Sequence, residues 1–149
     1  MHRRAVLAFS LLAACSSRSS NESEPDAAPA LRSDRPLAAV GRAGRLHFSF
    51  ELEPASPRVG ELFQVVTTVR DARSGVPLER AEFELDATMP QHGHGMSTRP
   101  EHREQGEGRY LTEGMKLHMP GRWELRARAR TPSIDDEIAL VYEQPVSGS

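Results

Sequence analysis

Apolar and polar side chains alternate along most of the chain beyond Leu46, which is the pattern of strands that bury one face. In residues 46–52 the apolar positions are all even numbers, and Pro54 ends the run. In residues 81–88 they are all odd. The pattern predicts strands at residues 46–52, 61–70, 81–88, 110–119, 122–130 and 137–142.

The clearest alternation begins at Trp123, where Trp, Leu and Ala alternate with Glu and Arg as far as Arg130. We expect Trp123 to face the core and the arginines to face solvent, as charged rows on one side of a strand usually do. Residues 97–108 are polar and are predicted as a loop, and Glu113–Gly114 is predicted to hold a bulge or a tight turn. No helical periodicity is present, so the sequence predicts an all-β, antiparallel, immunoglobulin-like β-sandwich.

The chain opens with a pattern typical of a secretion signal. Two arginines are followed by an apolar run over residues 5–14, which is too short for a permanent membrane span. The run ends in Leu-Ala-Ala-Cys, which resembles a bacterial lipobox. We therefore expect a signal peptide over residues 1–14 and a lipid on Cys15, the single cysteine of the 149 residues. The alternative is an ordinary signal peptide with a cysteine there by chance.

Composition divides the rest of the chain into a tether, a domain and a tail. Residues 15–44 are rich in Ser, Ala, Pro and charged residues, so we expect a flexible, disordered tether. Residues 45–144 form the predicted domain and residues 145–149 the tail. Without the two leader arginines, 17 basic residues face 21 acidic ones, a net charge of −4. That charge argues against nucleic-acid binding.

Histidine and methionine gather in two short stretches among glycines and prolines. One reads Met-Pro-Gln-His-Gly-His-Gly-Met and ends at Met96, and the other begins with His118-Met119-Pro120. In an extended chain, His92, His94 and Met96 would share one face. Imidazole and thioether groups suit copper, so the sequence predicts a candidate copper site. The open alternative is a structural turn that binds no metal.

The candidate metal ligands differ in how well they could act together. If Leu117 and Met119 face the core, His118 faces solvent, and the adjacent pair cannot easily serve one ion. We therefore rank one set of candidate ligands, His92, His94 and Met96, above the other, His118 and Met119.

The domain resembles the YtkA-like family of small bacterial envelope modules. The resemblance rests on Val59-Gly60, on Met89-Pro90 with the histidine stretch that follows, and on Met119-Pro120-Gly121-Arg122-Trp123, and it covers most of residues 57–142. It implies an immunoglobulin-like fold in the cell envelope. Relatives are associated with envelope copper handling and with the neighbourhood of cytochrome oxidase, without an established activity.

No arrangement of residues has the spacing of a catalytic site, so we do not expect an enzyme. Two hypotheses remain. The first is a lipid-anchored envelope protein that binds or delivers copper. The second is a non-metal interaction module, accessory to an envelope complex. In both, the lipid holds the protein to a membrane, facing the periplasm. Ser16 after Cys15 favours the outer membrane.

Overall fold

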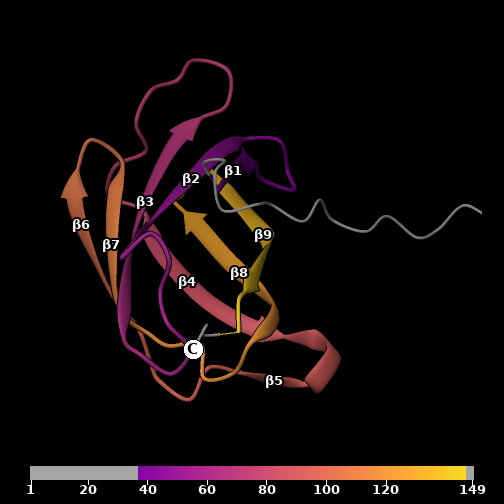
Figure 1. Cartoon of the computed structure of the whole chain (residues 1–149). Coiled ribbons are helices and arrows are strands. Elements are labelled where there is room, and N and C mark those ends of the chain that lie inside the picture. The colour runs from indigo at the N-terminus through magenta and orange to yellow at the C-terminus, as the bar shows by residue number, and fades with distance from the viewer. Residues whose placement is uncertain (1–36, 147–149) are drawn as a thin grey trace, which may run out of the picture.

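The computed structural model describes residues 37–146, which form nine strands in two antiparallel sheets (Figure 1). The five-stranded sheet has the order β1-β2-β3-β7-β6, and the four-stranded sheet has the order β5-β4-β8-β9. The first contains β1 (Leu37–Val40), β2 (Leu46–Glu53), β3 (Phe63–Asp71), β7 (Arg109–Met115) and β6 (Glu101–Gly106). The second contains β5 (His94–Gly95), β4 (Glu82–Met89), β8 (Gly121–Arg130) and β9 (Asp135–Gln144).

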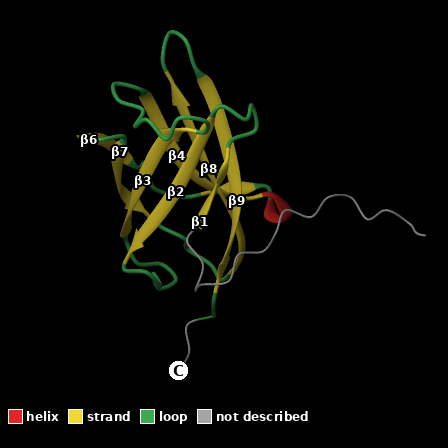
Figure 2. Ribbon diagram, turned by 90° about the horizontal axis from the view of Figure 1, so that it is seen from above, coloured by secondary structure: helices red, strands yellow, loops and turns green. Residues whose placement is uncertain are grey.

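The predicted all-β sandwich is confirmed. Six of the strands, β2, β3, β4, β7, β8 and β9, lie where the alternation predicted them, except that β7 ends at Met115, so residues 116–119 of the predicted strand form a loop. The one helical segment within residues 37–146 is a single 3-10 turn, η1 (Pro90–His92), drawn in red in Figure 2. With three residues, η1 is far shorter than a membrane-spanning helix, and residues 37–146 contain no other helical segment. The predicted signal peptide, and Cys15 with it, lie outside the described residues.

Two predictions of irregular structure were wrong. Strand β6 lies inside residues 97–108, which were predicted as a loop, and residues 101–105 are all exposed there. An edge strand with no buried face shows no apolar alternation. Strand β1 lies near the end of the predicted tether, residues 15–44, so that prediction is wrong from Leu37 on, and residues 15–36 lie outside the described residues. Strand β1 pairs with β2 and buries Leu37, so the folded part begins no later than Leu37.

The core lies between the two sheets and is built from the apolar positions of the alternating strands. Trp123 is its largest fully buried side chain, with 0% of its surface exposed, as predicted. The predicted irregularity at Glu113–Gly114 is also present, because the pairing of β3 with β7 shifts register there and Gly114 has a positive φ of 84°. Other core members include Phe48, Val65, Leu85, Met89, Tyr110, Met115, Leu117, Leu125 and Leu140.

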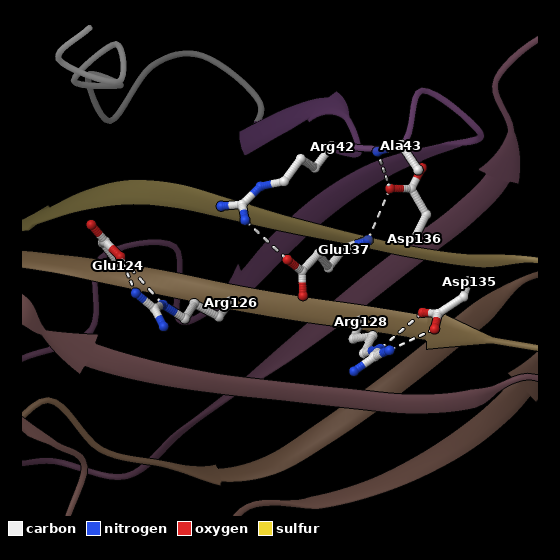
Figure 3. A network of polar contacts seen from close by, with 8 residues as sticks. All are labelled: Arg42, Ala43, Glu124, Arg126, Arg128, Asp135, Asp136 and Glu137. Carbon is white, nitrogen blue, oxygen red and sulfur yellow. Dashed lines mark hydrogen bonds and ion pairs between the residues drawn. The ribbon is translucent and has the colours of Figure 1, made fainter. Parts of the chain in front are cut away.

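The arginines of β8 lie on the solvent face of the four-stranded sheet, as predicted. Arg126 pairs with Glu124 at 2.8 Å, and Arg130 pairs with Glu82 at 2.9 Å. Figure 3 shows the Arg126 pair lying along the sheet. These arginines are therefore neutralised by acidic neighbours on the same face, which disfavours an anion-binding patch.

A buried carboxylate joins the β1–β2 turn to β9 (Figure 3). Asp136 is 2% exposed and accepts hydrogen bonds from the backbone N–H groups of Ala43 at 2.7 Å, Arg45 at 2.8 Å and Leu46 at 2.9 Å. A Cβ at Gly41 would come within 2.5–2.6 Å of the carboxylate, so the turn can close over Asp136 only with glycine there. We call Asp136 and these three N–H groups the carboxylate latch.

Candidate metal centre

The first histidine loop, residues 90–96, reverses the chain tightly at the end of β4. Pro90 opens η1, because proline suits the first position of a helical turn and lacks an N–H to satisfy. Gly93 then takes a left-handed conformation, with φ 68°, and the chain returns as β5. There His94 pairs with Met89. The loop therefore carries His92 at its tip and His94 beside the end of β4.

The second histidine loop, residues 116–120, connects β7 to β8 and places His118 next to the first histidine loop. The ring centroids of His94 and His118 are 5.0 Å apart, and those of His92 and His94 are 5.8 Å apart. With metal–nitrogen bonds of about 2.0 Å, two imidazoles on one ion have centroids about 4.5–6.3 Å apart. Both separations fall in that range. We call these three residues the histidine row.

Trp123 forms the floor beneath two rings of the histidine row. Its indole meets His118 edge-on at 5.3 Å and His94 at 6.0 Å between centroids. Its Nε1–H donates to the carbonyl of Met119 at 3.0 Å, so a fully buried side chain also fixes the second loop. The sequence predicted Trp123 only as a core residue. The turn at Pro120-Gly121, which brings His118 back over the start of β8, was the signal for this second role.

The hydrogen bond of His94 indicates which nitrogen is available to a ligand. Nδ1 lies 3.3 Å from the carbonyl oxygen of Gly95. A carbonyl can only accept, so this contact places the proton on Nδ1 and leaves the Nε2 lone pair free. Ligating imidazoles are commonly oriented by such a bond from the other nitrogen.

The two methionines lie differently from the histidines. The backbone N–H of Lys116 donates to the Met96 sulfur at 3.4 Å, and both Met96 and Met119 are partly buried against the core. His118 is exposed and Leu117 is buried, so the predicted opposition of their side chains is confirmed. Our ranking placed Met96 above His118, whereas the structure places the His118 ring next to that of His94.

Residues 92–96 do not form the continuous extended segment on which the predicted shared face of His92, His94 and Met96 depended. Residues 90–92 form the turn η1, and only His94 and Gly95 are extended. Proline at position 90 and a left-handed glycine at position 93 impose that reversal. Proximity of His92 to His94 therefore comes from the turn.

The family comparison matches this part of the molecule. A model of the YtkA-like family matches residues 43–128, more than half of the chain, and the match includes both histidine loops. The chain belongs to the YtkA-like family. Searches of curated proteins and of solved structures found no match.

The YtkA-like domain does not hold its histidines in a closed metal-binding arrangement. Within residues 37–146, no three or more His, Cys, Asp or Glu side chains stand together as a formed metal site. His92 and His118 are exposed at the surface, however, and exposed side chains change rotamer readily. The rings of His92 and His118 can therefore turn without movement of the core.

A hollow with a volume of about 1000 Å³ lies on the outer face of the four-stranded sheet of the YtkA-like domain, and it is lined by residues other than those of the histidine row. Its lining includes Glu84, Asp86 and His102. His102 is exposed as a whole residue, but its ring lies edge-on to Phe83 at 5.8 Å between centroids. That partial burial lowers the pKa of His102, while the nearby carboxylates of Glu84 and Asp86 act in the opposite direction. His102 Nδ1 lies 3.1 Å from the Thr112 hydroxyl, which gives the ring a structural partner. Acidic and basic side chains both line the hollow, and among the described residues no group of metal ligands is brought together there.

Proposed function

We propose that this YtkA-like domain binds one copper ion through the histidine row and that the protein carries copper at the cell envelope. The observation that supports the proposal is that the His92 ring and the His118 ring, from two different loops, each lie at a distance from the His94 ring that suits two imidazoles on one ion. Imidazole suits copper in both oxidation states. Acid should weaken binding, because protons compete with the metal for imidazole nitrogen.

The chain's single tryptophan makes the test direct. Trp123 lies under two of the proposed ligands, so bound Cu(II) should quench its fluorescence, with saturation at one equivalent and a Kd below about 1 μM. Replacing His92 and His94 together by alanine should weaken binding at least about a hundredfold, since losing even an outer-shell partner of a ligand costs about 10–100-fold. His47→Ala serves as the control, because His47 lies in β2, outside the histidine row.

Two results would contradict the copper proposal. One is binding weaker than micromolar in the unaltered protein. The other is binding that persists after both histidines are replaced, because the ion would then be held elsewhere.

We further propose that the domain is anchored by a lipid on Cys15 and faces the periplasm, with the outer membrane favoured. The support is the lipobox-like Leu12–Cys15 and Ser16 after it. Cys15→Ala should move the protein from the membrane fraction to the soluble fraction or block its processing, and a Ser16→Ala variant is the neighbouring control. Membrane association and electrophoretic mobility unchanged in Cys15→Ala would contradict the anchor.

One observation supports the second hypothesis, an interaction module that binds no metal. Strand β6 is at the edge of the five-stranded sheet, and residues 101–105 are exposed. An extended segment of a partner could add to such an edge through main-chain hydrogen bonds. Charged side chains on the edge, including Glu101 and Arg103, would restrict which segments fit.

A further inference from the structure

We propose that Met96 is a positioning residue, whose sulfur holds the His118 loop against the His94 loop, and that the resulting all-imidazole site prefers Cu(II) to Cu(I). The inference rests on the proposed copper function and names the ion that the site selects. It also assigns Met96 a role other than that of a ligand.

Met96 bridges the two loops through two hydrogen bonds of different kinds. Its backbone N–H donates to the carbonyl of Ala87 at 3.1 Å, which fixes the residue to β4, the strand from which the first loop leaves. Its sulfur accepts the backbone N–H of Lys116 at 3.4 Å, which belongs to the second loop. His94 lies two residues before Met96, and Lys116 lies two residues before His118. These two hydrogen bonds of Met96, which we call the bridge, therefore lie close in sequence to both proposed ligands.

The second loop is held on both sides of His118. The Lys116 N–H is bound by the Met96 sulfur, and the Leu117 carbonyl accepts the N–H of Gly60 at 2.8 Å. On the other side, the Met119 carbonyl accepts the indole N–H described above. These bonds restrain the backbone around His118 and leave its imidazole exposed at the surface. A restrained backbone with a free ring is suited to a ligand that must be placed but must also rotate.

This assignment decides which oxidation state the site favours. A thioether ligand would add a preference for Cu(I). A site of imidazole nitrogens alone lacks that preference, so the balance moves toward Cu(II), which nitrogen ligands bind well. The Met96 side chain is partly buried against the core, and its sulfur is engaged with the Lys116 amide. Met119 is likewise partly buried against the core, so we assign the imidazole nitrogens of the histidine row as the ligands.

The test compares Met96→Leu, which keeps the apolar volume but removes the acceptor, with Met96→Gln, which supplies an oxygen acceptor. Met96→Leu should lower Cu(II) affinity by about two- to tenfold, the range that one net hydrogen bond corresponds to. It should lower Cu(I) affinity by no more than that. Met96→Gln should restore most of the Cu(II) affinity, and the nitrogen hyperfine pattern of bound Cu(II) should be the same in all three proteins.

The metal-free protein provides a second measurement. Amide exchange at Lys116 should be faster in Met96→Leu than in the unaltered protein, because the N–H loses its partner. Met115→Leu is the matched control, since Met115 is a fully buried methionine at the end of β7 and leaves the bridge intact.

The outcomes separate this inference from the copper proposal. A loss of Cu(I) affinity far larger than the loss of Cu(II) affinity in Met96→Leu would show that the sulfur is a ligand, and would overturn the inference while leaving copper binding intact. An unchanged Lys116 amide would overturn the positioning role. Absence of Cu(II) binding in the unaltered protein would contradict the proposed function, and the Lys116 measurement, made without metal, distinguishes that failure from failure of the bridge.

Discussion

The two ends of the β8–β9 hairpin differ in how they hold the loops that cover them. At one end Asp136, opposite Ala129, binds the β1–β2 turn through the carboxylate latch. At the other end, near Gly121, the histidine row lies over Trp123. Ala129 lies eight positions after Gly121 in β8, a distance of about 27 Å in an extended strand. One hairpin thus supports two different loop arrangements.

The two ends differ in the strength of these contacts and in how far the contacts bury the side chains. The latch uses a buried charge and short hydrogen bonds that leave the carboxylate 2% exposed. The histidine end uses ring contacts, each individually weak, and a sulfur hydrogen bond, and it leaves His92 and His118 exposed. We infer that the latch is built for stability, whereas the histidine end keeps the rotational freedom that ligand binding requires.

The largest expected effect is that of Trp123→Ala, which would test whether the histidine end also depends on the core. Removing a fully buried aromatic side chain should lower the free energy of unfolding by about 3–5 kcal/mol, through lost burial and a cavity. Chemical unfolding measures this cost. Trp123→Phe should recover much of the stability but leave the Met119 carbonyl without its donor. Emission typical of a solvated indole in the unaltered protein would contradict the inward orientation.

Asp136→Ala should be the most damaging change at the latch end. It removes the acceptor of four backbone N–H groups, the three of the latch and that of Glu137, and should cost about 2–4 kcal/mol of unfolding free energy, with water replacing part of the lost bonding. Copper binding by the folded variant should be unchanged. Asp135→Ala is the adjacent control, because Asp135 pairs with Arg128 at the surface, where ion pairs contribute little. Equal losses in the two variants would show that burial of Asp136 has no special effect.

Acid should weaken the latch selectively. Burial alone would raise the pKa of Asp136, but the N–H groups of Ala43, Leu46 and Arg45 outweigh it and hold that pKa below the ordinary value of 3.8. A carboxyl with a depressed pKa in the folded state contributes stability that is complete above its unfolded pKa. That contribution is lost as pH falls through the folded pKa. Unfolding free energies measured from pH 6 downward should therefore fall more steeply in the unaltered protein than in Asp136→Asn. Parallel curves would contradict this role.

How far the sequence predicts the fold depends on burial of one face. Strands such as β2 and β8 alternate because one face enters the core, so their positions and the sandwich class follow from the sequence alone. Strand β6 has no buried face, and β1 contributes only four residues. Their pairing is decided by neighbouring strands, which no local pattern records.

The candidate site is predictable in its composition but not in its geometry. The clustering of His and Met along the chain is enough to identify His92, His94 and His118 as candidates. The proximity of His118 to His94 depends on two loops that are 24 residues apart, and on the indole floor between them. The assumption of an extended chain over residues 92–96 failed because η1 reverses the backbone. Tertiary contacts therefore decide which residues form the row.

His92→Ala should have the smallest effect on stability and the clearest effect on function. His92 is exposed at the tip of the first loop, so its loss should change the unfolding free energy by no more than about 0.5 kcal/mol. Copper affinity should nevertheless fall by at least about tenfold if the ring is a ligand. Asp136→Ala is expected to do the reverse, so the pair forms a double dissociation between the two ends. Measuring both variants by chemical unfolding and by Cu(II) titration checks this. Destabilisation by His92→Ala comparable with that of Asp136→Ala would show that the histidine end, too, is built for stability.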